Sequence, residues 1–357
     1  MKRGTSITKK DIVEGEIPVV SGGREPAYYC DKYNRDGETI TVAGSGAGAG
    51  YVQYWTKPIF VCDAFSIQGN PGIQTKYIYY FLTNIQDYIY STKKGGGVPH
   101  VHISSIENVS VPVPPLPVQR EIVRILDNFT ELTAELTAEL TARKKQYAYY
   151  RDKLLSTNNS SVPVVELRDI VKKSCSGATP AKGNAEYYEN GTIPWIRTQD
   201  VRFNEITEVN SYITEKAVSE TATKWIPENC VIVAISGATA GRCAINKIKA
   251  TTNQHCLNLI IDDSMALYRY VFHCLCSKYE ELISRKQGAR GDLNSSLILS
   301  LPIPIPSLEV QKRLVKVLDN FDAICSDLKI GLPAEIEARQ KQYEYYRDKL
   351  LTFTPAD

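Results

Sequence analysis

The chain has 357 residues, more than a single hydrophobic core usually organises, so two globular units are expected. Its 43% hydrophobic and 23% charged residues are ordinary for a soluble folded protein, and the net charge of +2 does not by itself indicate a nucleic-acid binder. A DNA-binding face would have to come from local clustering of lysine and arginine. The basic N-terminus lacks the apolar segment of a secretory signal, and no apolar run is long enough to span a bilayer. We therefore expect a soluble, cytoplasmic protein with no membrane partner.

Nine cysteines are present, none of them in C-x-x-C spacing, and most have apolar neighbours. This pattern favours reduced, buried thiols over a disulfide framework. The segments His255-Cys256 and His273-Cys274-Leu275-Cys276 raise the alternative of a zinc site. They lie in stretches with strand and helix patterns, not on the tight turns that bring tetrahedral ligands together, so we expect no metal.

The chain begins with a unit of mixed α/β character, from Met1 to about Val111. A Gly-Glu-Ile-Pro block stands at residues 15–18. Between Glu38 and Tyr54, β-branched residues alternate with small and polar ones, which predicts strands. Residues 77–90 have the periodicity of a helix.

The segment Gly44-Ser45-Gly46-Ala47-Gly48-Ala49-Gly50 loosely fits a nucleotide-binding G-x-G-x-x-A loop. A phosphate-binding loop should open an amphipathic helix, however, and residues 51–67 continue as strand. We therefore expect a tight turn, in which glycine allows positive φ angles, and no nucleotide cofactor. The chain also lacks a G-x-x-x-x-G-K-[ST] loop and an Asn/Asp-Pro-Pro-aromatic signature, so neither ATP binding nor methyl transfer is indicated.

A long amphipathic helix is predicted after the proline-rich residues 112–117. Apolar residues recur at helical spacing from Ile122 to Leu140, and neither glycine nor proline interrupts the chain through Leu155. Such a helix of about 38 residues would extend about 57 Å. Residues 133–140 read Thr-Ala-Glu-Leu twice, which favours a length-variable unit of about 6 Å over a simple leucine stripe.

A polar link at residues 156–163 leads to a second α/β unit, which ends near Ile303. This unit repeats the order of the first, with Gly-Thr-Ile-Pro at residues 191–194, strand-like residues 230–261 and helix-like residues 266–286. Its opening segment, Val164–Ile170, has no counterpart before Gly15. We therefore expect the first unit to be clipped at its N-terminus, with an incomplete DNA face.

A second long helix follows, and its sequence repeats that of the first. Residues 118–129 (Val-Gln-Arg-Glu-Ile-Val-Arg-Ile-Leu-Asp-Asn-Phe) recur as residues 310–321, and residues 145–155 recur as residues 341–351. Gly331-Leu332-Pro333 should kink or restart this helix. Together with Ser-Gly-Ala-x-Ala-Gly and Gly-x-Ile-Pro, four blocks match in the same order, which indicates a tandem duplication.

Two long helices with one apolar stripe each can hide the stripes most simply against each other. In the alternative, each stripe packs on its own globular unit, but the helices are long for that arrangement. We predict an α/β fold with two related mixed α/β domains separated by a pair of long antiparallel coiled-coil helices, with pseudo-two-fold symmetry. The expected boundaries are residues 1–111 for the first domain, 112–156 for the first helix, 157–303 for the second domain and 304–357 for the second helix.

The repeated helical blocks closely resemble those of the specificity subunit of Type I restriction-modification systems. They read Val-Gln-x-x-x-Val-x-x-Leu-Asp-Asn-Phe and Lys-Gln-Tyr-x-Tyr-Tyr-Arg-Asp-Lys-Leu-Leu, and the resemblance covers nearly the whole chain. It implies two target-recognition domains that each read one half of a split DNA site, without catalytic activity. It also implies that the paired helices dock two methyltransferase subunits, to which restriction subunits attach, and that the Thr-Ala-Glu-Leu count sets the half-site spacing.

Two loops at equivalent places before the last strand of each domain, residues 93–102 and 285–294, suit contact with DNA. Their cations would neutralise phosphates and their glycines would allow close approach, although a solvated basic loop is the alternative. In residues 195–200, Arg197 and Gln199 would reach base edges, while burial of Trp195 in the core is favoured over stacking on DNA. The candidate DNA-binding residues are Lys93, Lys94, Gly96, His100, His102, Arg197, Gln199, Lys286, Arg290 and Asn294.

Tyrosines near the helix ends suit helix packing or a partner interface. We expect a non-catalytic DNA specificity subunit that binds double-stranded DNA and docks methyltransferase and restriction subunits, with no cofactor. A coiled-coil adaptor whose α/β domains bind other proteins is the alternative, and the missing motifs disfavour a nuclease or methyltransferase. The candidate docking residues are Tyr147, Tyr150, Tyr343 and Tyr346.

Overall fold

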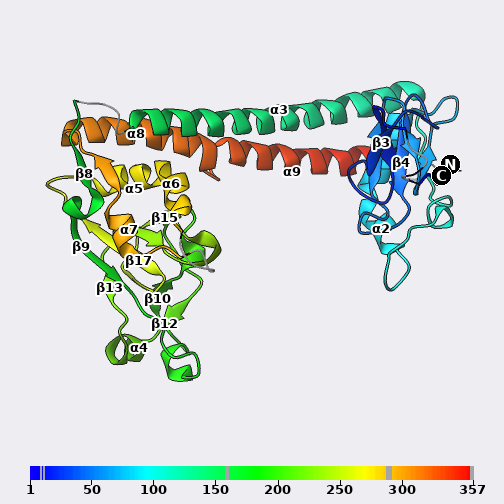
Figure 1. The fold of residues 1–357 in the computed structure, drawn as a ribbon. Coiled ribbons are helices and arrows are strands. Elements are labelled where there is room, and N and C mark those ends of the chain that lie inside the picture. Colours follow the sequence, from blue (N-terminus) through cyan, green and yellow to red (C-terminus); the bar gives the residue numbers. More distant parts are fainter. Residues whose placement is uncertain (9, 11–12, 157–160, 287–291, 354–357) are drawn as a thin grey trace. The chain divides into compact units, whose positions relative to one another are not determined.

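The computed structural model describes residues 1–8, 10, 13–156, 161–286 and 292–353. The chain divides into two compact units, one formed by residues 1–138 with 334–357 and the other by residues 139–333. Each unit contains one α/β domain together with parts of the long helices (Figure 1). The helix α3 (Leu116–Leu154) contributes to both units.

The first domain is built on an antiparallel sheet with the strand order β1-β7-β4-β5. Its central strand β4 (Thr39–Ala43) is rich in β-branched residues and buried along its whole length. A smaller sheet has the order β3-β2-β6, and the helix α1 (Thr75–Asn84) packs on β4 and β5. The other elements are β1 (Lys2–Arg3), β2 (Ile17–Val20), β3 (Tyr28–Cys30), β5 (Val52–Trp55), β6 (Phe60–Val61), β7 (Ala64–Ile67) and α2 (Gln86–Ser91).

The second domain repeats this plan and adds to it. Its main sheet has the order β11-β15-β14-β17-β9 and its smaller sheet the order β12-β10-β16-β13, while β18 pairs with β8. The helix α5 (Tyr268–Ser277) packs on β14 and β15. The other elements are β8 (Val164–Glu166), β9 (Val171–Ser176), β10 (Ile193–Ile196), β11 (Asn204–Ile206), β12 (Tyr212–Ile213), α4 (Glu215–Glu220), β13 (Trp225–Ile226), β14 (Val231–Ala234), β15 (Cys243–Asn246), β16 (Ala250–Thr252), β17 (Cys256–Ile261), α6 (Tyr279–Ser284), α7 (Ser295–Leu299) and β18 (Pro302–Pro304).

The duplication extends to strand order and register. Val42 of β4 pairs with Phe65 of β7, as Val233 of β14 pairs with Leu257 of β17. In both domains the strand that begins at the isoleucine of the Gly-x-Ile-Pro block runs parallel to one strand and antiparallel to another. The predicted glycine turns are confirmed, because φ is positive at Gly46 (79°) and at its counterpart Gly237 (73°).

The N-terminal edge is where the two domains differ. β1 pairs with β7 where the end of β9 pairs with β17, so Lys2 and Arg3 occupy the place of Cys175 and Ser176. The expected last strand is present in the second domain as β18, but residues 109–113 form no strand within the described chain. The prediction of a last strand in the first domain was therefore wrong. In the second domain the partner of β18 is β8.

The long first helix is confirmed, since α3 has 39 residues and begins at the end of the proline-rich stretch. The expected break in the second helix is also confirmed, because α8 (Leu308–Ser326) ends before Gly331 and α9 (Leu332–Leu351) begins after it. The Thr133 and Thr137 hydroxyls donate to the carbonyls of Phe129 and Thr133, one turn earlier in α3. None of the helices in the described residues is long and apolar enough to cross a membrane.

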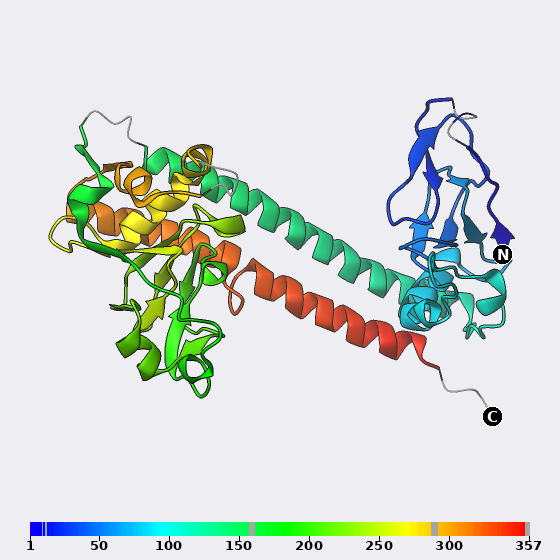
Figure 2. The same cartoon turned by 60° about the horizontal axis from the view of Figure 1, so that its bottom comes forward.

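Both predicted modes of helix packing occur. At the start of α3, Ile122 and Leu126 are buried against Tyr77 and Tyr80 of the helix α1 in their own domain, together with Leu351 of α9. Farther along, helices pair with each other, as Figures 1 and 2 show within each unit. The ring centroids of Phe129 on α3 and Tyr346 on α9 are 5.5 Å apart, and those of Tyr150 on α3 and Phe321 on α8 are 6.1 Å apart.

Candidate nucleic-acid interface and helix junctions

A buried glutamine attaches the first domain to α3. Gln119 is 0% exposed, and its amide oxygen accepts a hydrogen bond from the backbone N–H of Gln74 at 2.9 Å. Its amide nitrogen donates to the carbonyl oxygens of Gly72 at 3.1 Å and Pro114 at 2.8 Å. One side chain therefore fixes the entry to α1, the turn before it and the proline-rich stretch.

Gln311 makes the same set of contacts at the start of α8. It is also 0% exposed, accepts from the backbone N–H of Leu267 at 2.9 Å, and donates to the carbonyl oxygens of Met265 at 3.1 Å and Pro306 at 2.9 Å. A buried amide that loses its hydrogen-bond partners is costly, so each glutamine holds its domain in one orientation on its helix.

An aspartate two helical turns after each glutamine completes the junction. Asp127 accepts hydrogen bonds from the Lys76 ammonium at 2.8 Å and from the Tyr80 hydroxyl at 2.5 Å. The neighbouring Tyr77 hydroxyl donates to the carbonyl of Pro112 at 2.8 Å. Burial and then the nearby carboxylate raise the pKa of Tyr80, so its hydroxyl remains a donor at neutral pH.

Asp319 is the counterpart in the second unit, with different partners. It lies 2.5 Å from Nε of Arg269 and 2.7 Å from Nε2 of the fully buried His273. Burial alone would raise the pKa of Asp319, but the hydrogen bonds from His273 and Arg269 outweigh it and hold that pKa below its usual range. Arg269 also pairs with Glu205, and the Tyr270 hydroxyl donates to the Pro304 carbonyl at 2.8 Å.

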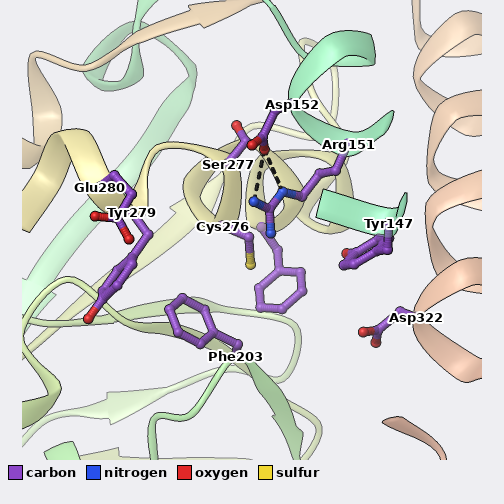
Figure 3. Close-up of a pocket in the computed structure, with 10 residues that line it drawn as sticks. Tyr147, Arg151, Asp152, Phe203, Cys276, Ser277, Tyr279, Glu280 and Asp322 are labelled. Atoms are coloured by element: carbon purple, nitrogen blue, oxygen red, sulfur yellow. Dashed lines mark hydrogen bonds and ion pairs between the residues drawn. The ribbon is translucent and has the colours of Figure 1, made fainter. Parts of the chain in front are cut away.

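The last turns of α3 line a pocket of about 270 Å³ in the second unit (Figure 3). The Tyr147 hydroxyl lies 3.3 Å from Nδ1 of His273, and Arg151 pairs with Asp152 at 2.8 Å. Burial raises the pKa of Tyr147 and also that of Asp322 across the pocket. Tyr147 is therefore engaged in holding α3 to the second domain.

The four candidate docking tyrosines fall into two classes. Tyr147 and Tyr343 are half-buried, and burial raises the pKa of Tyr343 as it does that of Tyr147. Tyr150 and Tyr346 are 40% and 42% exposed, with one face on a phenylalanine of the neighbouring helix. Of the four, the exposed pair is the one accessible to a partner.

The first candidate DNA loop is a short hairpin. Lys94 and His100 exchange backbone hydrogen bonds of 2.9 and 2.8 Å around the exposed Gly96. The Lys93 ammonium lies 4.2 Å from the centroid of the Tyr90 ring, while the rings of His100 and His102 stack with centroids 6.3 Å apart. Both histidines line a pocket of about 270 Å³ with Arg3, so the loop brings these polar groups to one surface.

The second candidate loop is described only at its ends. Arg290 lies outside the described residues. Lys286 is half-buried after the end of α6. Asn294 precedes α7, and its side-chain oxygen accepts from the backbone N–H of Leu297 at 2.8 Å, so this amide caps a helix.

The two candidate residues after β10, Arg197 and Gln199, differ in their surroundings. Trp195 is 7% exposed, as expected for a core residue, yet it lines a cleft of about 600 Å³ together with Arg197. Gln199 is exposed and is not among the residues that line this cleft. Sequence reasoning missed the other polar residues of the cleft, which come from segments far apart in the chain: Lys182, Asn210, Tyr212, Asn253, Gln254 and His255.

The cysteines and acidic groups form no further chemical centre in the described chain. All nine cysteines carry free thiols, seven of them buried. Burial raises the pKa of the Cys230 thiol to about 12, so it is not a reactive thiolate at neutral pH. Within the described ranges, no group of three or more His, Cys, Asp or Glu side chains is placed to hold a metal ion.

Comparisons with known proteins agree with one another. A family model described as Type I restriction modification DNA specificity domain matches residues 1–143 and 159–338. The Type I restriction enzyme EcoR124I/EcoR124II specificity subunit of Escherichia coli is 39% identical over 291 residues, which is 78% of this chain and 70% of that protein. The crystal structure of a Type I restriction-modification S subunit from M. genitalium has a TM-score of 0.63 at 18% identity, with 99% of this chain and 94% of that chain covered. A chain from a study of complex assembly and conformational transition of the type I R-M system has a TM-score of 0.66 at 14% identity, with 95% and 92% covered.

Proposed function

Because the chain belongs to the Type I restriction-modification DNA specificity family and is a specificity subunit, we propose that it binds a two-part duplex DNA site, one part on each α/β domain. The observation that carries this proposal is the repeated junction. Gln119 and Gln311 attach the two domains to their helices through equivalent contacts, as two readers of one duplex require. The DNA-facing residues are the hairpin around His100 in the first domain and the cleft beside Arg197 in the second.

A salt series tests recognition directly. Methylation profiling of cells that carry this chain with its methyltransferase partner would report the two-part motif, and duplexes with that motif then serve as ligands. We expect binding of the complex to need both half-sites and to weaken steeply with salt, because phosphate contacts release counterions. Equal binding to a scrambled duplex would contradict the proposal and favour a protein-binding adaptor.

The spacing between half-sites depends, in this proposal, on the length of α3. Within residues 133–140, the leucines Leu136 and Leu140 are half-buried and the glutamates are exposed, so one more Thr-Ala-Glu-Leu unit would disturb neither domain core. The insertion adds about 6 Å and about 40° of rotation to the helix, against about 3.4 Å for each DNA base pair.

Inserting one unit should therefore shift the preferred spacer upward by one or two base pairs, and deleting one should shift it downward. The measurement is the spacer in the methylated motif. The variant Glu135→Gln, which keeps the helix length, is the control and should retain the original spacer. An insertion that leaves the spacer unchanged would contradict this role of α3.

We further propose that two methyltransferase subunits dock on the helices, one near Tyr150 and one near Tyr346, and that restriction subunits join through them. The support is the duplication itself, because both tyrosines belong to the same repeated block and expose similar fractions of their surface. The mass of the complex of this chain with its methyltransferase, measured in solution, tests the number of copies.

A further inference from the structure

The second domain contains a cleft of about 600 Å³ between β10, β12 and the turn that joins β16 to β17. A cavity of this size can hold a nucleobase together with parts of the adjoining nucleotides. Its polar lining includes one arginine, one lysine, amides and an imidazole: Lys182, Arg197, Asn210, Asn253, Gln254 and His255.

Arg197 is positioned over a tryptophan ring and has a hydrogen-bond donor that is unpaired within the described chain. Its guanidinium carbon lies 5.7 Å from the centroid of the Trp195 ring, and the Trp195 indole N–H donates to the Ala178 carbonyl at 3.2 Å, which fixes the ring. Nε of Arg197 is buried and has no hydrogen-bond partner in the described part of the chain. A buried donor without an acceptor is costly, so its presence here points to an acceptor that arrives with a ligand.

The wall opposite is a turn whose side chains are tied together. Gln254 accepts a hydrogen bond from the Thr179 hydroxyl, and its amide nitrogen lies 3.1 Å from Nε2 of His255. The Asn253 side chain is 7% exposed and accepts from the backbone N–H of His255 at 3.1 Å. These contacts orient amide and imidazole groups that offer both donors and acceptors, a mixture that suits base edges better than phosphate, which only accepts.

We propose that this cleft reads a guanine in the half-site of the second domain, with Arg197 donating to the O6 and N7 acceptors of its major-groove edge. The inference rests on the proposed DNA-binding function and names the residue that discriminates. Gln254 and His255 contact the neighbouring base pair, and Lys182 at the cleft neutralises a phosphate. The first domain has Ser21 at the position equivalent to Arg197, as expected if the two domains read different half-sites.

The test uses the complex of the full chain with its methyltransferase partner and duplexes that carry its own methylated motif. We expect Arg197→Ala to reduce the preference for guanine at one position of one half-site by about 10- to 100-fold, and to leave the other positions unchanged. Arg197→Lys keeps the charge but replaces the planar two-pronged donor with a single ammonium, and should weaken the same preference less than Arg197→Ala does. The control is Arg168→Ala, because this arginine of the same domain pairs with Glu166 at 2.6 Å and lies outside the cleft.

The possible outcomes are distinguishable. If Arg197→Ala weakens binding to all duplexes equally, the guanidinium contacts phosphate, and the reading of guanine is overturned. A half-site of the second domain without a G·C pair, or an Arg197→Ala complex with wild-type selectivity, would also overturn it, although the proposal of two-part recognition would remain. A wild-type complex without any sequence selectivity would instead overturn the proposed function.

Discussion

In both units the junction between domain and helix has the same geometry, but the partners of its aspartate differ. In the first unit Asp127 binds an ammonium and a phenol, from Lys76 and Tyr80, whereas in the second Asp319 binds the guanidinium of Arg269 and an imidazole. The glutamine contacts and the tyrosine-to-carbonyl hydrogen bond are the same in both. The glutamine and tyrosine contacts therefore fix the position of each helix, and the partners of the aspartate can differ without a shift of the helix.

Removing the glutamines is the strongest way to test this equivalence. Gln119→Ala and Gln311→Ala each remove the three hydrogen bonds of a fully buried amide, so we expect each to lower the free energy of unfolding of its own unit by about 2–4 kcal/mol. Hydrogen exchange of the amides in α1 and α5 would report the two units separately. Gln342→Ala, an exposed position on α9, is the control and should change little. Equal loss of protection in both units from one substitution would show that the junctions are not independent.

Acid should weaken the junction of the second unit. Because the folded-state pKa of Asp319 is depressed, its contribution to stability is complete above the ordinary aspartate pKa of about 3.9 and is lost as the pH falls through the depressed value. Asp322, one turn later, has a pKa raised by burial, so its contribution favours the folded state at low pH and is lost as the pH rises through the raised value.

Asp319→Asn should therefore flatten the acid-side loss of stability in the second unit and cost about 1–3 kcal/mol at neutral pH. Asp127→Asn should cost about 1 kcal/mol, since Lys76 and Asp127 are 31% and 34% exposed and water screens their attraction. Asp322→Asn should raise stability at neutral pH. Denaturant unfolding between pH 3 and pH 7 measures all three, and a wild-type acid slope in Asp319→Asn would contradict the assignment.

The smallest expected effect is at the exposed tyrosines. Tyr150→Ala and Tyr346→Ala each remove one ring contact between helices, which is worth about 0.5–1 kcal/mol, and the two losses should be equal. If both tyrosines dock partners, each variant should also weaken binding of the methyltransferase subunit. A variant that loses stability but binds the methyltransferase normally would limit that tyrosine to helix packing.

The repeats made much of the fold predictable. Contacts between residues far apart in the sequence could not be predicted. Repeated blocks and their periodicity located α3 and the break before α9, and glycine spacing located the turns at Gly46 and Gly237. The aspartates stand in the repeated block, but their cationic partners lie 51 and 50 residues upstream and differ in type, so no pattern joins them. The cleft beside Arg197 was not predicted for the same reason, because four separate segments of the chain line it. A last strand was expected after the loop at residues 93–102, but a strand also needs a partner, which β18 has in β8.

The order in which the chain is made has a consequence for the first unit. Its compact unit includes residues 334–357, and Leu351 of α9 is 2% exposed in the cluster that contains Tyr77 and Leu126. At a synthesis rate of about 5–20 residues per second, α9 follows the first 138 residues by about 10–40 seconds, during which the whole second unit emerges. The domain that leaves the ribosome first is thus the last to be completed, and until then the apolar surface that receives Leu351 is uncovered on the nascent chain.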